Sequence, residues 1–218
     1  MSDYLLDLAL SIPALLIALT VHEFSHGIVS YWLGDPTPKM DGRVTLNPAR
    51  HIDPIGLLSL LLFHVGWAKP VRINSEYYKN PKWGTVLVAL AGPLSNFIVA
   101  FISGLFSALA LHSYYLSGAR LAEVLYYICQ NIVILNLGLG LFNLIPLPPL
   151  DGSKILQGFL PQKARMSYIN LERYSMWILL GLLLVIDLLP MIGIPNPIDL
   201  ALNFLFKTFN NFWFNIVF

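Results

Sequence analysis

Long apolar segments recur along the whole chain, and they limit the folds that it can adopt. Five are long enough to cross a bilayer as helices, which takes roughly 17–25 residues each; they lie at residues 4–33, 84–111, 121–147, 173–191 and 198–218. Only 11% of the 218 residues are charged, whereas a soluble domain carries about 25%. The sequence therefore predicts an all-α polytopic membrane protein with about five transmembrane helices.

The connection between the first two spans, residues 34–83, is the longest polar stretch. Its apolar piece at 55–67 is too short to span and is interpreted as re-entrant, interfacial or buried. Two further pieces, GRVTLNP at 42–48 and AKPVRIN at 68–74, are rich in strand-forming residues and bounded by Gly, Pro and Asn. They are predicted either as a small β-hairpin against the membrane face or as irregular loop. With no linker or repeat, residues 1–218 are expected to form a single membrane domain.

The distribution of Lys and Arg predicts an orientation. Seven lie in the 34–83 connection, one in 112–120, four in 147–173 and none in 191–198. Basic residues are enriched in cytoplasmic loops, so this alternation places the first and third of these connections in the cytoplasm and the N-terminus outside. Lys207, within the last apolar segment, is not explained by this scheme.

A polar cluster, HEFSH at residues 22–26, interrupts the first apolar segment. Positions i and i+4 share one face of a helix, so His22 and His26 can reach one metal ion, while Glu23 can contact water at that ion without being a ligand. Zinc lowers the pKa of such a water toward about 7, and a carboxylate can accept its proton. Each ionisable side chain costs roughly 2.5–3.5 kcal/mol at a bilayer centre, which indicates a function. The alternative is a structural polar cluster at the cytoplasmic end of the helix.

Asp151 is the candidate for a third ligand, because a catalytic zinc site uses three protein ligands and one open position. The first and third spans cross the membrane in the same direction, so FNLIPLPPLDG at 142–152 lies at a depth similar to HEFSH. Its prolines cannot continue a helix, and unwound backbone at this depth is tolerated only around a cavity or in a protein interior. The alternative is a helix cap or an Asp-Gly turn. His51 and His64 are interpreted as turn or interfacial residues, with a role as auxiliary metal ligands as the alternative.

These motifs together resemble those of the site-2 protease family, peptidase family M50, in its compact bacterial and archaeal form without PDZ or CBS domains. The family pattern combines HExxH in one span with N-x-x-P-x-x-x-L-D-G in a later one, and NLIPLPPLDG at 143–152 matches the second motif. AGPLSN at 91–96 is similar to the family's A-G-P-x-x-N element. The resemblance covers about residues 20–155 and leaves 173–218 as accessory helices.

The resemblance implies an intramembrane metalloendopeptidase with one zinc ion per chain, held by His22, His26 and Asp151, with Glu23 activating water. It further implies cleavage of a transmembrane protein substrate near the cytoplasmic face of a prokaryotic cell membrane. Asn143, which stands at the asparagine position of the family motif, is expected to engage the substrate backbone. Asn96 is a second candidate for substrate binding, and for both asparagines the alternative is a hydrogen bond between helices.

Two other functions are alternatives to proteolysis. A metal transporter usually has repeated halves with binding elements in both, and the sequence contains one HEFSH and no internal duplicate. A catalytically idle zinc-binding scaffold would have no need of the non-ligand carboxylate of Glu23. The net charge of +1 and the lack of a basic run exclude nucleic acid as a partner. The expected partners are the substrate and the lipid bilayer, and association into a homo-oligomer stays open.

Overall fold

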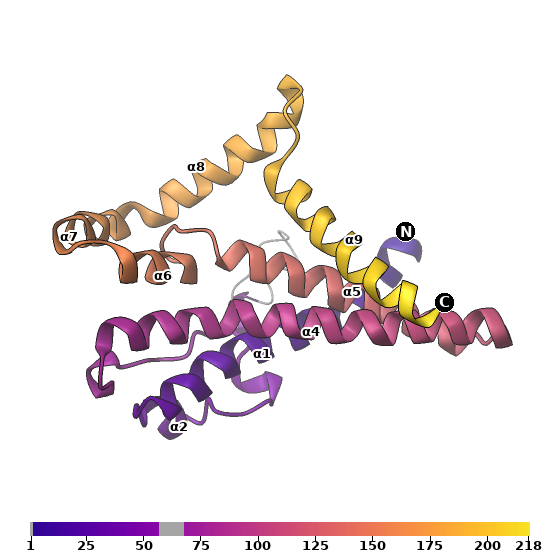
Figure 1. Cartoon of the computed structure of the whole chain (residues 1–218), viewed down its shortest axis with the longest axis horizontal. Coiled ribbons are helices and arrows are strands. Elements are labelled where there is room, and N and C mark those ends of the chain that lie inside the picture. The colour runs from indigo at the N-terminus through magenta and orange to yellow at the C-terminus, as the bar shows by residue number, and fades with distance from the viewer. Residues whose placement is uncertain (1, 57–67) are drawn as a thin grey trace.

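The structure is a computed structural model that describes residues 2–56 and 68–218. The regular elements of these residues are helices (Figure 1). In chain order they are α1 (Ser2–Trp32), α2 (Thr37–Met40), η1 (Pro48–Arg50), η2 (Ser75–Tyr77), α4 (Pro81–Ser117), α5 (Arg120–Asn143), α6 (Asp151–Phe159), α7 (Gln162–Asn170), η3 (Leu171–Tyr174), α8 (Ser175–Leu188), η4 (Leu189–Ile192) and α9 (Pro197–Val217), where η marks a 3-10 helix. The predicted re-entrant piece lies outside the described residues, apart from its first two positions.

Four stretches within the described residues are long and apolar enough to cross a membrane: Ser11–Trp32, Pro81–Ser117, Arg120–Asn143 and Gln162–Ile192. They correspond to the first four predicted spans, and the chain is a multi-pass membrane protein. The fifth predicted span, residues 198–218, is helical as α9 but is not among them. Its Asp, Lys and several Asn residues lower its hydropathy below that of the other four. The prediction of five spans is corrected to four candidate spans in the described part.

Helices α1, α4 and α5 pack side by side at the centre, and α9 returns across α4 and α5 (Figure 1). Small residues at these interfaces, such as Ala14 and Ala18 of α1, are buried and let the helix backbones approach closely, as in other membrane helix bundles. Ala100, Val133 and Leu137 form a buried apolar cluster against which side chains of α9 pack. The packing of α4 against α1 brings the HEFSH motif against the AGPLSN element.

The ends of the helices around the site follow from local sequence. The Asn80 side chain caps α4 by accepting the backbone N–H of Trp83, and α4 ends at Gly118, whose φ of 63° suits glycine. Helix α5 ends at Asn143, before the proline-rich segment that cannot remain helical. Helix α6 then begins at Asp151. The proline-rich turn therefore sets where the acid is placed.

The predicted β-hairpin is not found, since the described residues contain no strand ladder, only an isolated antiparallel bridge between Ile52 and Ala68. Beside this bridge, Lys69 N–H donates to the His51 carbonyl (2.8 Å). Two later donors of the 68–74 segment bond to carboxylates instead: Val71 N–H donates to Glu23 Oε2 (3.0 Å) and Asn74 N–H donates to Asp35 Oδ2 (2.8 Å). These backbone donors thus serve the first helix and the turn that follows it.

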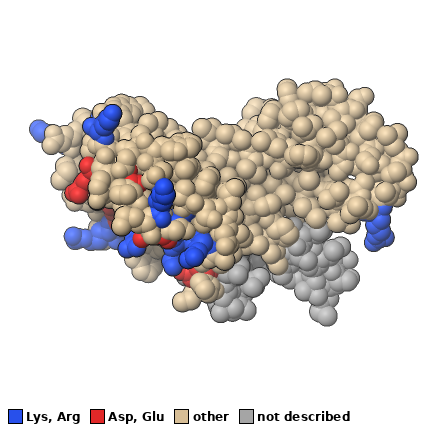
Figure 2. Space-filling model, turned by 90° about the horizontal axis from the view of Figure 1, so that it is seen from below, with Lys and Arg blue, Asp and Glu red and all other residues tan. Residues whose placement is uncertain are grey.

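The charged side chains gather at one end of the molecule on the face shown in Figure 2, the end that carries α2, α7 and the start of α4 in Figure 1. The opposite end, where α4 is followed by α5, shows little charge on this face. Helices α2 and α7, which belong to the two basic connections of the sequence, thus lie at the same end of the helix bundle.

Candidate metal centre

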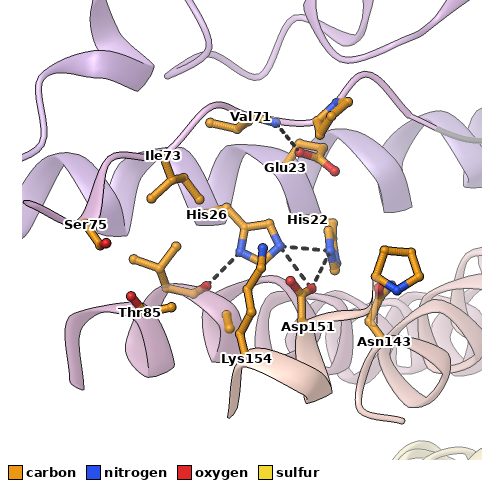
Figure 3. Close-up of a pocket in the computed structure, with 14 residues that line it drawn as sticks. His22, Glu23, His26, Val71, Ile73, Ser75, Thr85, Asn143, Asp151 and Lys154 are labelled. Atoms are coloured by element: carbon orange, nitrogen blue, oxygen red, sulfur yellow. Dashed lines mark hydrogen bonds and ion pairs between the residues drawn. The ribbon is translucent and has the colours of Figure 1, made fainter. Parts of the chain in front are cut away.

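Two histidines of α1 and the first residue of α6 converge in the interior (Figure 3). Nε2 of His22 and Nε2 of His26 are 3.0 Å apart, and each lies 3.1 Å from Oδ2 of Asp151. All three side chains are buried. The helix places the two imidazoles one turn apart on one face, and the turn after α5 brings the carboxylate to them.

The hydrogen bonds behind the two imidazoles fix which nitrogen faces Asp151. Nδ1 of His22 lies 2.7 Å from Oδ1 of Asn96, and Nδ1 of His26 lies 2.7 Å from the carbonyl oxygen of Val88. Both oxygens can only accept, so each Nδ1 carries the proton and each Nε2 presents a lone pair. Two imidazole lone pairs and a carboxylate oxygen therefore point at one position, which calls for a cation between them.

The geometry and the ligand types fit zinc. Atoms that hold a tetrahedral zinc ion at about 2.0 Å lie about 3.3 Å from one another, close to the separations of 3.0 and 3.1 Å found here. Imidazole nitrogen and carboxylate oxygen are both zinc ligands, and three of them leave the open position that a catalytic site requires.

Glycine is required at two positions beside the cluster. A Cβ at position 92 of α4 would lie 2.5 Å from Nε2 of His26 and 2.6 Å from Cε1 of His22. A Cβ at position 152 would collide with the carbonyl oxygens of Leu144 and Ile145. Gly92 therefore lets α4 pass close to the imidazole pair, and Gly152 lets the chain fold back tightly at the start of α6.

Gly92→Ala is expected to lower zinc content and to destabilise the protein by about 1–3 kcal/mol, the typical result of overpacking. The added methyl group would meet imidazole rings that are held by hydrogen bonds and cannot move away freely. Zinc analysis and the free energy of unfolding measure the two effects. Gly138→Ala in α5 is the matched control, because a Cβ there meets nothing within 4 Å. Equal zinc content in Gly92→Ala and Gly138→Ala would contradict the close approach.

Glu23 lies beside the cluster without belonging to it. Its Oε2 accepts the Val71 N–H at 3.0 Å, and its side chain lines the same cavity, of about 300 Å³, as the two histidines and Asp151. Figure 3 shows Glu23 and Val71 on one side of the cavity, with Asp151 and Lys154 on the other. A carboxylate held by one oxygen next to a candidate metal position is suited to accept a proton from water.

The two predicted substrate-binding asparagines have different surroundings. Asn143, the last residue of α5, lines the cavity; its Nδ2 donates to the carbonyl of Leu139 (3.0 Å), and its amide oxygen has no hydrogen-bond partner among the described residues. Asn96 is fully buried and bonded to His22 instead of lining the cavity. For Asn143 and Asn96 alike, contact with substrate stays a prediction. His51 bonds to the carbonyl of Thr45 outside the cluster.

Three residues of the site were not predicted from the sequence. Val88 and Val71 act through backbone groups, which every residue has, so only the fold could reveal them. Lys154 lies one turn after Asp151 and lines the cavity. Its position could have been inferred from the i, i+3 spacing once α6 was known to begin at Asp151.

The fold and the site together define a multi-pass membrane protein of the HExxH metallopeptidase type. Residues 105–186 match the family described as Peptidase family M50. The chain is 41% identical over 169 residues to "Putative zinc metalloprotease YwhC" of Bacillus subtilis (strain 168), covering 77% of each chain. It therefore belongs to peptidase family M50, a family of zinc metalloproteases, which confirms the family predicted from the motifs.

Two further relatives are also named as zinc metalloproteases. The chain is 28% identical over 185 residues to "Putative zinc metalloprotease Rip2" of Mycolicibacterium smegmatis, which covers 80% of this chain and 66% of that protein. It is 35% identical over 85 residues to "Zinc metalloprotease MJ0392" of Methanocaldococcus jannaschii, which covers 39% of this chain and 22% of that protein. No solved structure matches the chain significantly.

Proposed function

We propose that this protein is an intramembrane zinc endopeptidase that hydrolyses a peptide bond in or near a transmembrane segment of a membrane-protein substrate. The observation that carries the proposal is that His22 and His26, in a helix long enough to span a membrane, converge with Asp151 of the short helix α6 at separations that fit zinc. The carboxylate of Glu23, which lines the same cavity, supports a hydrolase over a zinc-binding scaffold.

In this proposal His22, His26 and Asp151 hold one zinc ion per chain. Zinc, when bound, supplies a Lewis acid that lowers the pKa of water to about 7. Glu23 takes the proton as water attacks the scissile carbonyl, and it then delivers that proton to the leaving amine nitrogen as the C–N bond breaks. The Val71 N–H holds Oε2 of Glu23, and Oε1 has no hydrogen-bond partner among the described residues, so Oε1 is the oxygen available for proton transfer.

The substrate is expected to unwind before it is cleaved, because the carbonyls of a helix are already hydrogen-bonded within it. The substrate is therefore cleaved as an extended segment, and the amide oxygen of Asn143 can accept one of its backbone N–H groups.

The proposed activity is tested on purified protein mixed with a panel of single-span membrane proteins in liposomes. Fragments are expected that require zinc and disappear on addition of a chelator. Mass spectrometry of the fragments then locates the cleaved bond, which is expected in or near the transmembrane segment. Zinc uptake into the liposomes with no cleavage of any panel member would support the transporter instead. Zinc binding with neither uptake nor cleavage would support the scaffold.

We further propose that the charged end of the bundle, and with it the active site, faces the cytoplasm. The gathering of charge at that end supports this orientation under the positive-inside rule. Reporter fusions at Asn74 and Lys163 are expected to report a cytoplasmic location, and a fusion at Gly118 is expected to report an external one. An external signal from Asn74 would reverse the orientation.

A further inference from the structure

Asn96, in the middle of α4, joins three helices through its side-chain amide. Its Nδ2 donates to the carbonyl of Ala18 on α1 (3.0 Å) and to Oδ1 of Asn136 on α5 (2.8 Å). Its Oδ1 lies 2.7 Å from Nδ1 of His22. The side chain is 0% exposed, so no water competes for these bonds. Both N–H donors of the amide and one lone pair of its oxygen are thereby used within the protein.

The direction of this hydrogen-bond chain is fixed from its far end. Nδ2 of Asn136 donates to the carbonyl of Ile132 at 2.8 Å, which turns Oδ1 of Asn136 toward Asn96. The reverse orientation of the Asn96 amide would set its oxygen against two acceptors, Oδ1 of Asn136 and the carbonyl of Ala18. Oδ1 of Asn96 must therefore face His22, and an amide oxygen can only accept a hydrogen bond.

We propose that Asn96 is a positioning residue that holds the His22 ring in the tautomer with the proton on Nδ1, so that its Nε2 is available as a metal ligand. This inference rests on the proposed zinc site. Partners behind a ligating histidine fix the orientation and the tautomer of its ring. Here the proton acceptor is a side chain anchored on two other helices, so the packing of α1, α4 and α5 sets the direction of one ligand.

The second histidine shows why Asn96 is the residue to test. His26 donates from Nδ1 to the backbone carbonyl of Val88, which no substitution removes. Positions 88, 92 and 96 of α4 are spaced by one turn each and share a face, with Gly92 between the two acceptors giving room for both rings. One face of α4 thus supports both imidazoles, and only the Asn96 contact depends on the identity of a side chain.

The test compares zinc affinity in two leucine variants of the same buried network. Asn96→Leu keeps the branch at Cγ but removes the acceptor for His22, and we expect the zinc dissociation constant to rise about 10–100-fold, the usual effect of losing such a partner. Asn136→Leu disrupts the same network, but the Ala18 carbonyl still holds the Asn96 amide in its orientation, so we expect a change of less than about 3-fold. Asn96→Gln keeps an amide oxygen that can accept from His22 and N–H groups that can donate to the two acceptors, and it is expected to retain most of the affinity.

A second measurement reads the tautomer directly. In zinc-free protein labelled with ¹⁵N-histidine, the His22 signal is expected to report the Nδ1–H tautomer in the wild type and in Asn136→Leu. In Asn96→Leu it is expected to shift toward the Nε2–H form. Thermal unfolding of each variant shows whether the fold is kept.

Equal losses of zinc affinity in Asn96→Leu and Asn136→Leu, with an unchanged His22 tautomer, would reduce Asn96 to a packing residue and overturn the inference. If Asn96→Leu does not fold, Asn96→Gln decides. Its longer side chain changes the packing but keeps the acceptor, so a positioning role predicts that the Nδ1–H tautomer and zinc binding are kept, whereas a role in packing alone predicts that zinc affinity is lost. If the wild type binds no zinc, the proposed function itself is wrong. If the wild type binds zinc and Asn96→Leu has the same dissociation constant, only this inference is wrong.

Discussion

Glu23→Gln is expected to lower the rate of substrate cleavage by at least about 10²–10⁴-fold, the usual contribution of a general base. Glutamine is nearly isosteric, and its amide oxygen can still accept the Val71 N–H that Glu23 now accepts at 3.0 Å. It cannot take a proton from water. Because Glu23 is not one of the three clustered ligands, zinc content should stay at the wild-type level. Fragment formation and zinc content are measured on the same preparation.

Glu76→Gln provides the matched control, since Glu76 is exposed in η2 and does not line the cavity. It makes the same chemical change and should leave the cleavage rate unchanged. Substrate should still associate with Glu23→Gln and can be captured as an uncleaved complex. Cleavage by Glu23→Gln at the wild-type rate would show that the general-base mechanism is wrong, even with the zinc site intact.

Asp151→Ala is expected to reduce zinc content from about one ion per chain to nearly none, and cleavage should be lost with it. Removing the carboxylate leaves two imidazole ligands, fewer than the three that catalytic zinc sites use. His22→Ala and His26→Ala should have the same effect. Metal analysis after dialysis against a weak chelator measures the loss.

Asp199→Ala is the control for removal of an acid, because Asp199 is exposed on α9 and lies outside the candidate site. Its zinc content should equal that of the wild type. Full zinc occupancy in Asp151→Ala, with its helical content unchanged, would remove Asp151 from the site. The turn after α5 would then have a structural role only, as a helix cap or an Asp-Gly turn.

The spans could be predicted because helical period and hydropathy are local properties of the sequence. The four candidate spans of the described residues fall on the first four predicted segments. The fifth segment was predicted to span the membrane because it is rich in aromatic residues, but its polar residues lower its hydropathy. Asn210 pairs with Gln130 of α5, and the indole N–H of Trp213 donates to the carbonyl of Phe101 on α4. Helix α9 therefore packs on α4 and α5 through polar as well as apolar contacts.

The predicted hairpin failed for a reason that no local pattern contains. Strand propensity predicts an extended backbone, and Asn74, at the end of the 68–74 segment, has one. The partner of that backbone is decided by what lies beside it in space. Carboxylates of Glu23 and Asp35 occupy the donors of Val71 and Asn74, so within the described residues no neighbouring strand pairs with them.

The sequence by itself determined the helices, the asymmetry of charge and the chemical groups of the site. His22, Glu23 and His26 are fixed relative to one another by the helical period, and the proline-rich turn marked Asp151 as a candidate. Only the tertiary structure decided that Asp151 meets both imidazoles, that Gly92 gives them room, and that Asn96 and the carbonyl of Val88 turn each Nε2 toward the carboxylate. These features depend on how α1, α4 and α6 pack against one another, and backbone donors and acceptors are the same in every residue, so no local sequence pattern can encode them.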